Sequence, residues 1–289
     1  MITGTGNDSP VELLVRAGSN RLACRVFEGT GRPILALHGL ASNARWWDLV
    51  ARRLSPPNRV IAPDLRGHGR SDKPPSGYSF AEVGGDLIAL VGALHMRQPL
   101  VVGHSWGASV ALWLGAHLEE VAGVVCVDGG VVDLRQVFGD DWGEARERMR
   151  PPTVDGLDPE ELRRLVAASK IAEEVGEEDA LFAIMGNFEE GEDGRWRPRL
   201  DMNRHMEIAE ALYRFDLERA WKEVRCPVLY LLADDGSLQA SAKRARALHA
   251  QAMSAAGAEV VFIAGSHDLP VQHPAEVADR MLEFIDRIG

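Results

Sequence analysis

Short apolar runs alternate with longer stretches of helical periodicity through the first half of this 289-residue chain. Runs typical of strands lie at residues 11–16, 21–27, 33–38, 60–63, 100–103 and 123–127, with helical spacing at 44–54, 80–94 and 105–118. The alternation returns near the end, with strands at 227–233 and 259–264 and helices at 240–256 and 274–288. Because strands joined through helices pair in parallel, the pattern predicts an α/β fold with a mostly parallel eight-stranded sheet flanked by helices.

The middle of the chain, residues 129–225, lacks this alternation. A Pro151-Pro152 pair, a charge-dense helical stretch at 160–175 and a polar stretch at 189–199 take its place. We therefore expect a mainly helical cap at 129–225, inserted into a core made of residues 1–128 and 226–289.

Charge and composition exclude several classes of partner. The formal net charge of -11 would repel phosphate backbones and anionic lipid, so neither nucleic acid nor a membrane is an expected partner. Residues 1–10 lack the features of a secretory signal, and an odd number of cysteines (Cys24, Cys126 and Cys226) argues against a disulfide framework. These features predict a cytoplasmic protein, and no spacing suggests a metal site.

The strand at 100–103 runs directly into a Gly-x-Ser-x-Gly sequence with Ser105 at its centre, and a predicted helix follows. A serine hydroxyl is a weak nucleophile that must stand clear of the backbone at a sharp strand-to-helix turn. Gly103 and Gly107 permit the close packing of such a turn. The context thus predicts a nucleophile, beneath which the positive end of the helix dipole lies.

Three more motifs accompany this turn: Leu37-His38-Gly39-Leu40, the stretch 64–72 (Asp-Leu-Arg-Gly-His-Gly-Arg-Ser-Asp) and Gly265-Ser266-His267-Asp268. With them, nearly the whole chain outside the cap resembles the α/β-hydrolase family. The resemblance implies an oxyanion hole formed by the backbone N–H groups of Leu40 and Trp106. It also implies a mostly structural role for residues 64–72, so His38 and His68 are expected to be packed, hydrogen-bonded loop residues.

His267 is the expected general base. It follows an apolar strand, precedes the last helix, and comes after the serine in the chain, as the late histidine does in this family. The other histidines do not combine a loop after a strand with that position.

The acid that would orient His267 has two candidates. The family pattern Gly-x-x-Asp is broken at 233–236, where Gly236 stands at the expected carboxylate position and Asp235 lies one residue before it. Asp128 ends the strand after the nucleophile helix, which is the site that some members use. We favour Asp128 and keep Asp235 as the alternative.

Large aromatic groups follow the oxyanion motif and recur in the cap, which suggests an apolar acyl or alcohol group as guest. The residues expected to shape the substrate pocket are His38, Gly39, Trp46, Trp47, His104 and Trp142. The expected partner is a small-molecule substrate with an apolar group.

The resulting functional hypothesis is a serine hydrolase that cleaves a carboxylic ester, lactone or thioester through an acyl-enzyme on Ser105. A carbon–carbon bond hydrolase and a non-catalytic ligand-binding receptor are the alternatives, since they share the fold. Epoxide hydrolases and haloalkane dehalogenases use an aspartate nucleophile, which the serine argues against. No phosphate-binding loop or nicotinamide fingerprint is present, so no cofactor is expected.

Overall fold

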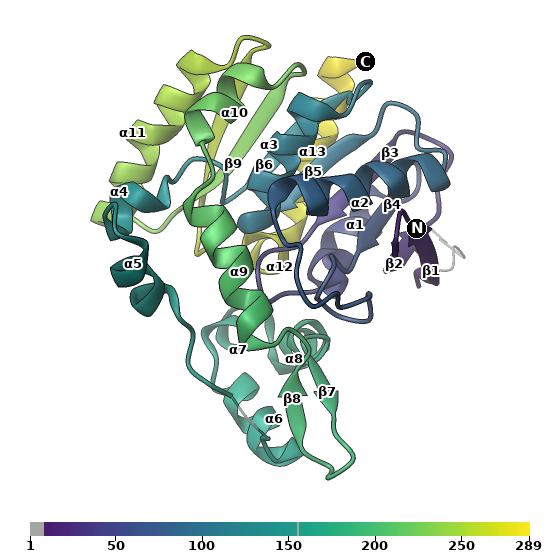
Figure 1. Cartoon of the computed structure of the whole chain (residues 1–289). Coiled ribbons are helices and arrows are strands. Elements are labelled where there is room, and N and C mark those ends of the chain that lie inside the picture. Colours follow the sequence, from purple (N-terminus) through teal and green to yellow (C-terminus); the bar gives the residue numbers. More distant parts are fainter. Residues whose placement is uncertain (1–8, 155) are drawn as a thin grey trace.

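A computed structural model describes residues 9–154 and 156–289. Its centre is an eight-stranded sheet with the order β1-β2-β4-β3-β5-β6-β9-β10 (Figure 1). Strand β2 pairs antiparallel with β1 and β4, and the other neighbours pair in parallel. The predicted mostly parallel sheet is confirmed. The first residues, on which the expectation of no secretory signal rests, lie largely outside the described part.

The strands begin and end within about a residue or two of the predicted limits. Their bounds are β1 Val11–Ala17, β2 Asn20–Phe27, β3 Pro33–Leu37, β4 Arg59–Pro63, β5 Leu100–His104, β6 Gly123–Val127, β9 Val228–Asp234 and β10 Ala258–Ala264. The helices of the core are η1 Ala44–Trp47, α1 Asp48–Leu54, α2 Phe80–Ala93, α3 Trp106–His117, α11 Leu238–Met253, α12 Leu269–Gln272 and α13 Pro274–Ile288.

Both faces of the sheet are covered, and each has its own apolar cluster. Successive residues of β3 divide between them: Leu35 contributes to the cluster under α2 and α3, and Ile34 to the cluster under α1 and α13. This follows from the period-two alternation of a strand, which points neighbouring side chains to opposite faces. The carboxyl ends of β3, β5, β6 and β10 then meet at one edge of the sheet, where ligands bind in open α/β folds.

The inserted segment is mainly helical: α4 Leu134–Phe138, α5 Trp142–Met149, α6 Pro159–Ala167, α7 Lys170–Val175, α8 Glu177–Met185, α9 Met202–Tyr213 and α10 Leu217–Glu223. It also holds a hairpin that we did not expect, β7 Phe188–Glu190 and β8 Trp196–Pro198, where the sequence predicted only a polar stretch. An Asp193-Gly194 turn with Gly194 at φ 73° closes it. Helix α10 packs on α3 and α11, whereas α6 and the hairpin project away from the sheet (Figure 1).

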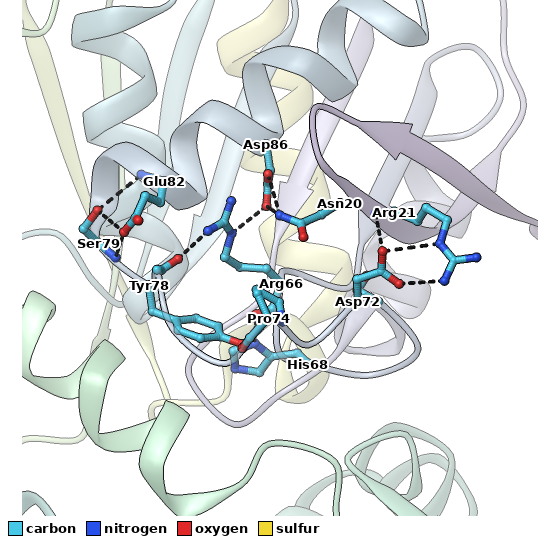
Figure 2. A network of polar contacts seen from close by, with 12 residues as sticks. Asn20, Arg21, Arg66, His68, Asp72, Pro74, Tyr78, Ser79, Glu82 and Asp86 are labelled. Atoms are coloured by element: carbon cyan, nitrogen blue, oxygen red, sulfur yellow. Dashed lines mark hydrogen bonds and ion pairs between the residues drawn. The ribbon is translucent and has the colours of Figure 1, made fainter.

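The loop after β4 is fixed by a buried ion pair (Figure 2). Arg66 Nε donates to Asp86 Oδ2 on α2 at 2.6 Å, and Asn20 Nδ2 donates to Asp86 Oδ1 at 3.1 Å. The side chains of Arg66 and Asp86 are 9% and 6% exposed. Nearer the surface, Arg21 and Asp72 form a second ion pair at 2.9 Å. These contacts hold the 64–72 loop against β2 and α2.

Neither a membrane span nor a metal cluster is found in the described part of the chain. No helix there is both long and apolar enough to cross a bilayer. No group of three or more His, Cys, Asp or Glu side chains there could hold a metal ion. The three cysteines are buried and free.

Candidate active site

Ser105 occupies a strained turn between β5 and α3. Its backbone lies at φ 55° and ψ -119°, a conformation that non-glycine residues seldom adopt. The Ser105 N–H donates to Val127 O at 3.0 Å, which ties the turn to β6. A Cβ on Gly103 would overlap the Gly107 carbonyl, and one on Gly107 would overlap the carbonyls that end β3. The two glycines are therefore needed for the close packing that presents the hydroxyl.

His267 connects this serine to a carboxylate. Its Nε2 lies 3.0 Å from Ser105 Oγ, and its Nδ1 lies 2.7 Å from Asp128 Oδ2. With Nδ1–H donating to Asp128, Nε2 accepts the hydrogen bond from the serine hydroxyl. The imidazole side chain is 53% exposed and the Asp128 side chain 2% exposed. This arrangement can pass the serine proton to the imidazole and stabilise the imidazolium that forms.

Asp128 has donors on both of its oxygens. Oδ1 accepts from the Ala233 N–H at 2.8 Å and from Lys243 Nζ at 2.7 Å, and Oδ2 accepts from His267. Burial alone would raise the Asp128 pKa, but the hydrogen bonds and charges of His267 and Lys243 outweigh it, and the pKa is lowered. Asp128 is therefore a carboxylate at neutral pH.

The alternative acid, Asp235, is not joined to the histidine. Its carboxylate is exposed and accepts a hydrogen bond from the Ser237 N–H at the start of α11. Within residues 9–154 and 156–289 it makes no hydrogen bond to His267, although it lines the same cavity. The geometry thus selects Asp128 of the two candidates.

The predicted oxyanion hole consists of the backbone N–H groups of Leu40 and Trp106. Trp106 is the first residue of α3, so its N–H has no carbonyl one turn earlier in the helix to bond. The turn at 38–40 packs against the nucleophile, because a Cβ on Gly39 would lie 3.2 Å from the Ser105 Cβ. Neither the Leu40 nor the Trp106 N–H donates a hydrogen bond to any of the described residues. Both are available to an anionic oxygen.

A model of the alpha/beta hydrolase family matches residues 34–280, which include every residue of this arrangement. The chain belongs to the α/β-hydrolase family. The resemblance inferred from the four motifs is thereby confirmed.

The relatives of this α/β hydrolase have diverse names. It is 29% identical to the 2-(acetamidomethylene)succinate hydrolase of Mesorhizobium japonicum over 245 residues, 80% of this chain and 81% of that enzyme. A crystal structure of E-2-(acetamidomethylene)succinate hydrolase superposes with a TM-score of 0.78 at 25% identity, over 96% of this chain and 99% of that one.

Two other similarities are local. An uncharacterized protein of Mycobacterium tuberculosis is 36% identical over 113 residues, 38% of this chain but only 33% of that protein's length. The soluble epoxide hydrolase of a Corynebacterium species is 40% identical over 88 residues, 30% of this chain and 31% of that enzyme. Hydrolase chemistry is shared by the named enzymes, but the bond that they cleave is not.

A cavity of about 330 Å³ opens beside Ser105 and His267. Its apolar wall comes from Val132, Leu134 and Leu212, and its polar wall from Ser109, Asp235 and Lys243. A second cavity of about 420 Å³ lies between the cap and the loops at 41–42 and 68–69, where His68, Met202 and His205 contribute to its lining.

Most of the side chains expected to shape the pocket lie elsewhere in this α/β hydrolase. His38 is fully buried and hydrogen-bonded to the backbone of Gly39 and Leu65, and Trp47 packs under α1 and α13. Trp46 is 6% exposed, and Trp142 packs on Tyr213 within the cap. Gly39 borders Ser105 itself, as described above. These aromatics fill the core or the cap and do not line the cavity beside the serine, so that expectation was wrong for them.

His104 is also buried, yet it contacts the proposed base. Its Nε2–H donates to the His267 carbonyl at 2.8 Å, while Trp46 stacks on its ring. Burial, followed by the nearby His267, lowers the pKa of His104 to about 3, so the ring is neutral. His104 thus holds the backbone of the His267 loop through this hydrogen bond and does not line the substrate cavity.

Sequence reasoning missed Lys243 and the leucines of the cavity wall. Lys243 lies on α11, 115 residues from the carboxylate that it contacts. Helical periodicity shows which face of α11 is apolar, but it does not show which turn of the helix reaches the end of β6. Leu134 and Leu212 likewise belong to cap helices whose placement depends on tertiary packing.

Proposed function

We propose that this chain is a serine hydrolase that cleaves a carboxylic ester, lactone or thioester through an acyl-enzyme on Ser105. The observation that carries the proposal is the hydrogen-bonded chain from Ser105 through His267 to Asp128, with both distances at 3.0 Å or less. A ligand-binding receptor does not require a serine, a histidine and a carboxylate joined in this order.

The proposed reaction starts when His267 Nε2 accepts the proton of Ser105 and Oγ attacks the carbonyl carbon. The resulting oxyanion is held by the N–H groups of Leu40 and Trp106. The tetrahedral intermediate collapses as His267 returns its proton to the leaving alkoxide or thiolate, which leaves an acyl ester on Ser105. Water then loses a proton to His267 and attacks the acyl ester, and the second tetrahedral intermediate collapses as His267 returns this proton to Ser105 Oγ and the acid is released.

The cavity beside the serine is the proposed acyl site. Val132, Leu134 and Leu212 line it, so it favours an apolar acyl chain over a charged one. The substrate is therefore a small molecule with an apolar group.

A second candidate is supported by one comparison. The relative from Mesorhizobium japonicum, matched over 80% of this chain, is named for a substrate that carries an acetamido group. With the same base and oxyanion site, Ser105 would attack an amide carbonyl, and His267 would protonate the departing nitrogen. Hydrolysis of a carbon–carbon bond adjacent to a carbonyl is the remaining alternative on this fold.

Turnover and labelling together test the proposal. Purified wild type is incubated with p-nitrophenyl acetate, butyrate and octanoate, and separately with a fluorophosphonate followed by intact-mass analysis. We expect ester turnover, one phosphonyl adduct per chain, and a loss of both in Ser105→Ala, with turnover reduced by about 10⁴-fold or more. Ser109→Ala, which removes a second serine of the same cavity, should still accept the label.

The alternatives give different outcomes. Labelling of Ser105 without ester turnover would redirect the search to amides and carbon–carbon substrates. An absence of both would contradict the serine hydrolase proposal and favour a ligand-binding role.

A further inference from the structure

Lys243 forms an ion pair with the carboxylate that holds the proposed base. Its Nζ lies 2.7 Å from Asp128 Oδ1 and 3.3 Å from Ala233 O. Its side chain is 21% exposed, against 2% for Asp128, so the pair is largely removed from water. In the Ser-His-Asp mechanism the acid acts on the histidine, and no ammonium group is required behind it.

The two oxygens of Asp128 have separate partners. Oδ1 accepts from Lys243 and from the Ala233 N–H, while Oδ2 has His267 as its one partner among the described residues. A carboxylate fixed through one oxygen cannot rotate about its terminal bond without breaking two hydrogen bonds, one of them charge-assisted. Lys243 and the Ala233 N–H together therefore restrict the direction in which Oδ2 points.

We propose that Lys243 is a positioning residue of the reaction: it holds Asp128 Oδ1, so that Oδ2 is directed toward His267, and its positive charge influences the pH dependence of the reaction. This inference rests on the proposed function for its kinetic consequence. The geometry on which it depends is independent of the substrate.

Other titratable groups surround His267 and the Asp128–Lys243 pair. Besides Asp128 and Ser105, His267 has neutral His104 from β5 beneath it and Asp268 beside it, and Glu174 of α7 binds Ser266 at 3.2 Å. Lys170 pairs with Glu174 at 3.7 Å, and exposed Asp235 lies on the far side, near Lys243.

Among these carboxylates, Asp128 contacts the His267 ring directly, at 2.7 Å from Nδ1. Lys243 is the cation that contacts Asp128 directly, and so it offsets the strongest of them. Removing the charge of Lys243 should leave buried Asp128 less stabilised as an anion and should therefore change the pH dependence of the reaction.

The test is the pH dependence of kcat/KM between pH 4.5 and 9, measured on the best p-nitrophenyl ester of the full chain. In Lys243→Met we expect the acidic limb to move up by about 0.5 to 1 pH unit. Activity at pH 5 should fall by about 3- to 10-fold more than activity at pH 8. Lys243→Arg keeps the charge and should restore the limb toward that of wild type.

A matched control separates charge from position. Lys222→Met removes the same charge from α10, where Lys222 pairs with Glu218 on the surface, and it should leave the limb unchanged. If Lys243→Met leaves both the acidic limb and the plateau of kcat/KM as in wild type, or lowers only the melting temperature, the pair is structural and the inference is wrong. Lys243→Gln, which keeps a donor, serves if the methionine variant does not fold.

A second readout does not need turnover. The imidazole resonances of His267 can be followed by ¹H–¹⁵N NMR as the pH is changed, with His267→Gln to assign them. We expect the midpoint to rise in Lys243→Met relative to wild type, whether or not any ester is cleaved. A midpoint that does not move would overturn the inference, and a midpoint that moves in a protein without esterase activity would contradict only the proposed function.

Discussion

Two loops at the carboxyl edge of the sheet each contain a histidine near glycine residues, but the two rings have different kinds of partner. His68, in the loop after β4, is 1% exposed, and both ring nitrogens bond the backbone: Nδ1–H donates to Arg66 O and Nε2 accepts from the Ala41 N–H. His267, in the loop after β10, is half exposed, and its nitrogens contact two side chains, Asp128 and Ser105. A ring held by backbone groups on both sides fixes a loop, whereas a ring between a hydroxyl and a carboxylate can transfer a proton.

Next to each loop, a buried carboxylate also forms an ion pair with a cationic side chain. Asp86 pairs with Arg66 and Asp128 with Lys243, and all four side chains are about one-fifth exposed or less. The difference lies in the third partner, which is the amide of Asn20 in one case and the imidazole of His267 in the other. Burial and ion pairing alone therefore do not distinguish Asp128, the proposed acid, from a carboxylate such as Asp86 that stabilises a loop.

The largest expected effect comes from replacing the carboxylate next to His267. Asp128→Asn should lower kcat by about 10³- to 10⁴-fold, because an amide can stabilise the wrong tautomer of His267 and does not stabilise its charged form. The measurement is ester turnover, with circular dichroism to confirm folding. Asp235→Asn, the matched control from the same cavity, should change kcat by less than about 3-fold. A greater loss in Asp235→Asn than in Asp128→Asn would reverse the assignment of the acid.

The corresponding substitution near the His68 loop, Asp86→Asn, should lower the stability of the fold instead of the activity. Asp86→Asn leaves Arg66 as an uncompensated buried charge, which typically costs about 3 to 5 kcal/mol of unfolding free energy. Urea unfolding measures the loss, and kcat/KM of the folded fraction should stay within about 3-fold of wild type. Asp72→Asn breaks the exposed pair with Arg21 in the same network (Figure 2) and should cost about 1 kcal/mol or less. Equal losses in the two variants would mean that burial does not set the strength of these pairs.

The sequence predicted the fold well because its signals are periodic. Apolar alternation located all eight strands of the sheet, and the apolar residues of the helices fall on the faces that cover it. The short hairpin in the cap was missed because β7 and β8 have only three residues each, too few for a period-two pattern to stand out.

In the candidate site, the sequence located those residues that are recognised from their neighbours in the chain, such as a preceding strand. Ser105 and His267 follow strands directly and so can be placed at the carboxyl edge. Two aspartates also follow strands, and only the packing of β6 beside β9 shows which carboxylate reaches the imidazole. The tryptophans after the oxyanion motif were misplaced because η1 turns their rings toward the core.

The buried histidines should make folding sensitive to acid. Burial lowers the pKa of His68 to about 3 and that of His38 to about 4, whereas the ordinary value is about 6.5. Between these values the unfolded chain binds more protons than the folded one, so the unfolding free energy falls as the pH drops through 6.5 toward 4. Each such ring can contribute up to about 1.4 kcal/mol per pH unit.

Urea unfolding at pH 7, 6 and 5 tests this difference between buried and exposed rings. His68→Gln should show a shallower decline than wild type across this range, although it is less stable at pH 7. His117→Gln removes an exposed histidine of α3 and should leave the decline unchanged. If His68→Gln and wild type lose stability in parallel, protonation of His68 does not contribute to the acid sensitivity.

The smallest expected effect distinguishes the cavities that border the two loops. Leu212→Ala enlarges the cavity of about 330 Å³ beside His267, which should shift preference toward octanoyl over butyryl esters. One additional buried methylene is worth about 0.8 kcal/mol, or about 4-fold in the ratio of kcat/KM values. Met202→Ala makes a comparable change in the cavity of about 420 Å³ beside His68 and should leave the acyl-length ratio unchanged, because the proposed acyl site is the other cavity. If only Met202→Ala changes the ratio, the acyl chain occupies the cavity on the His68 side, and that loop contributes to substrate selection as well as to folding.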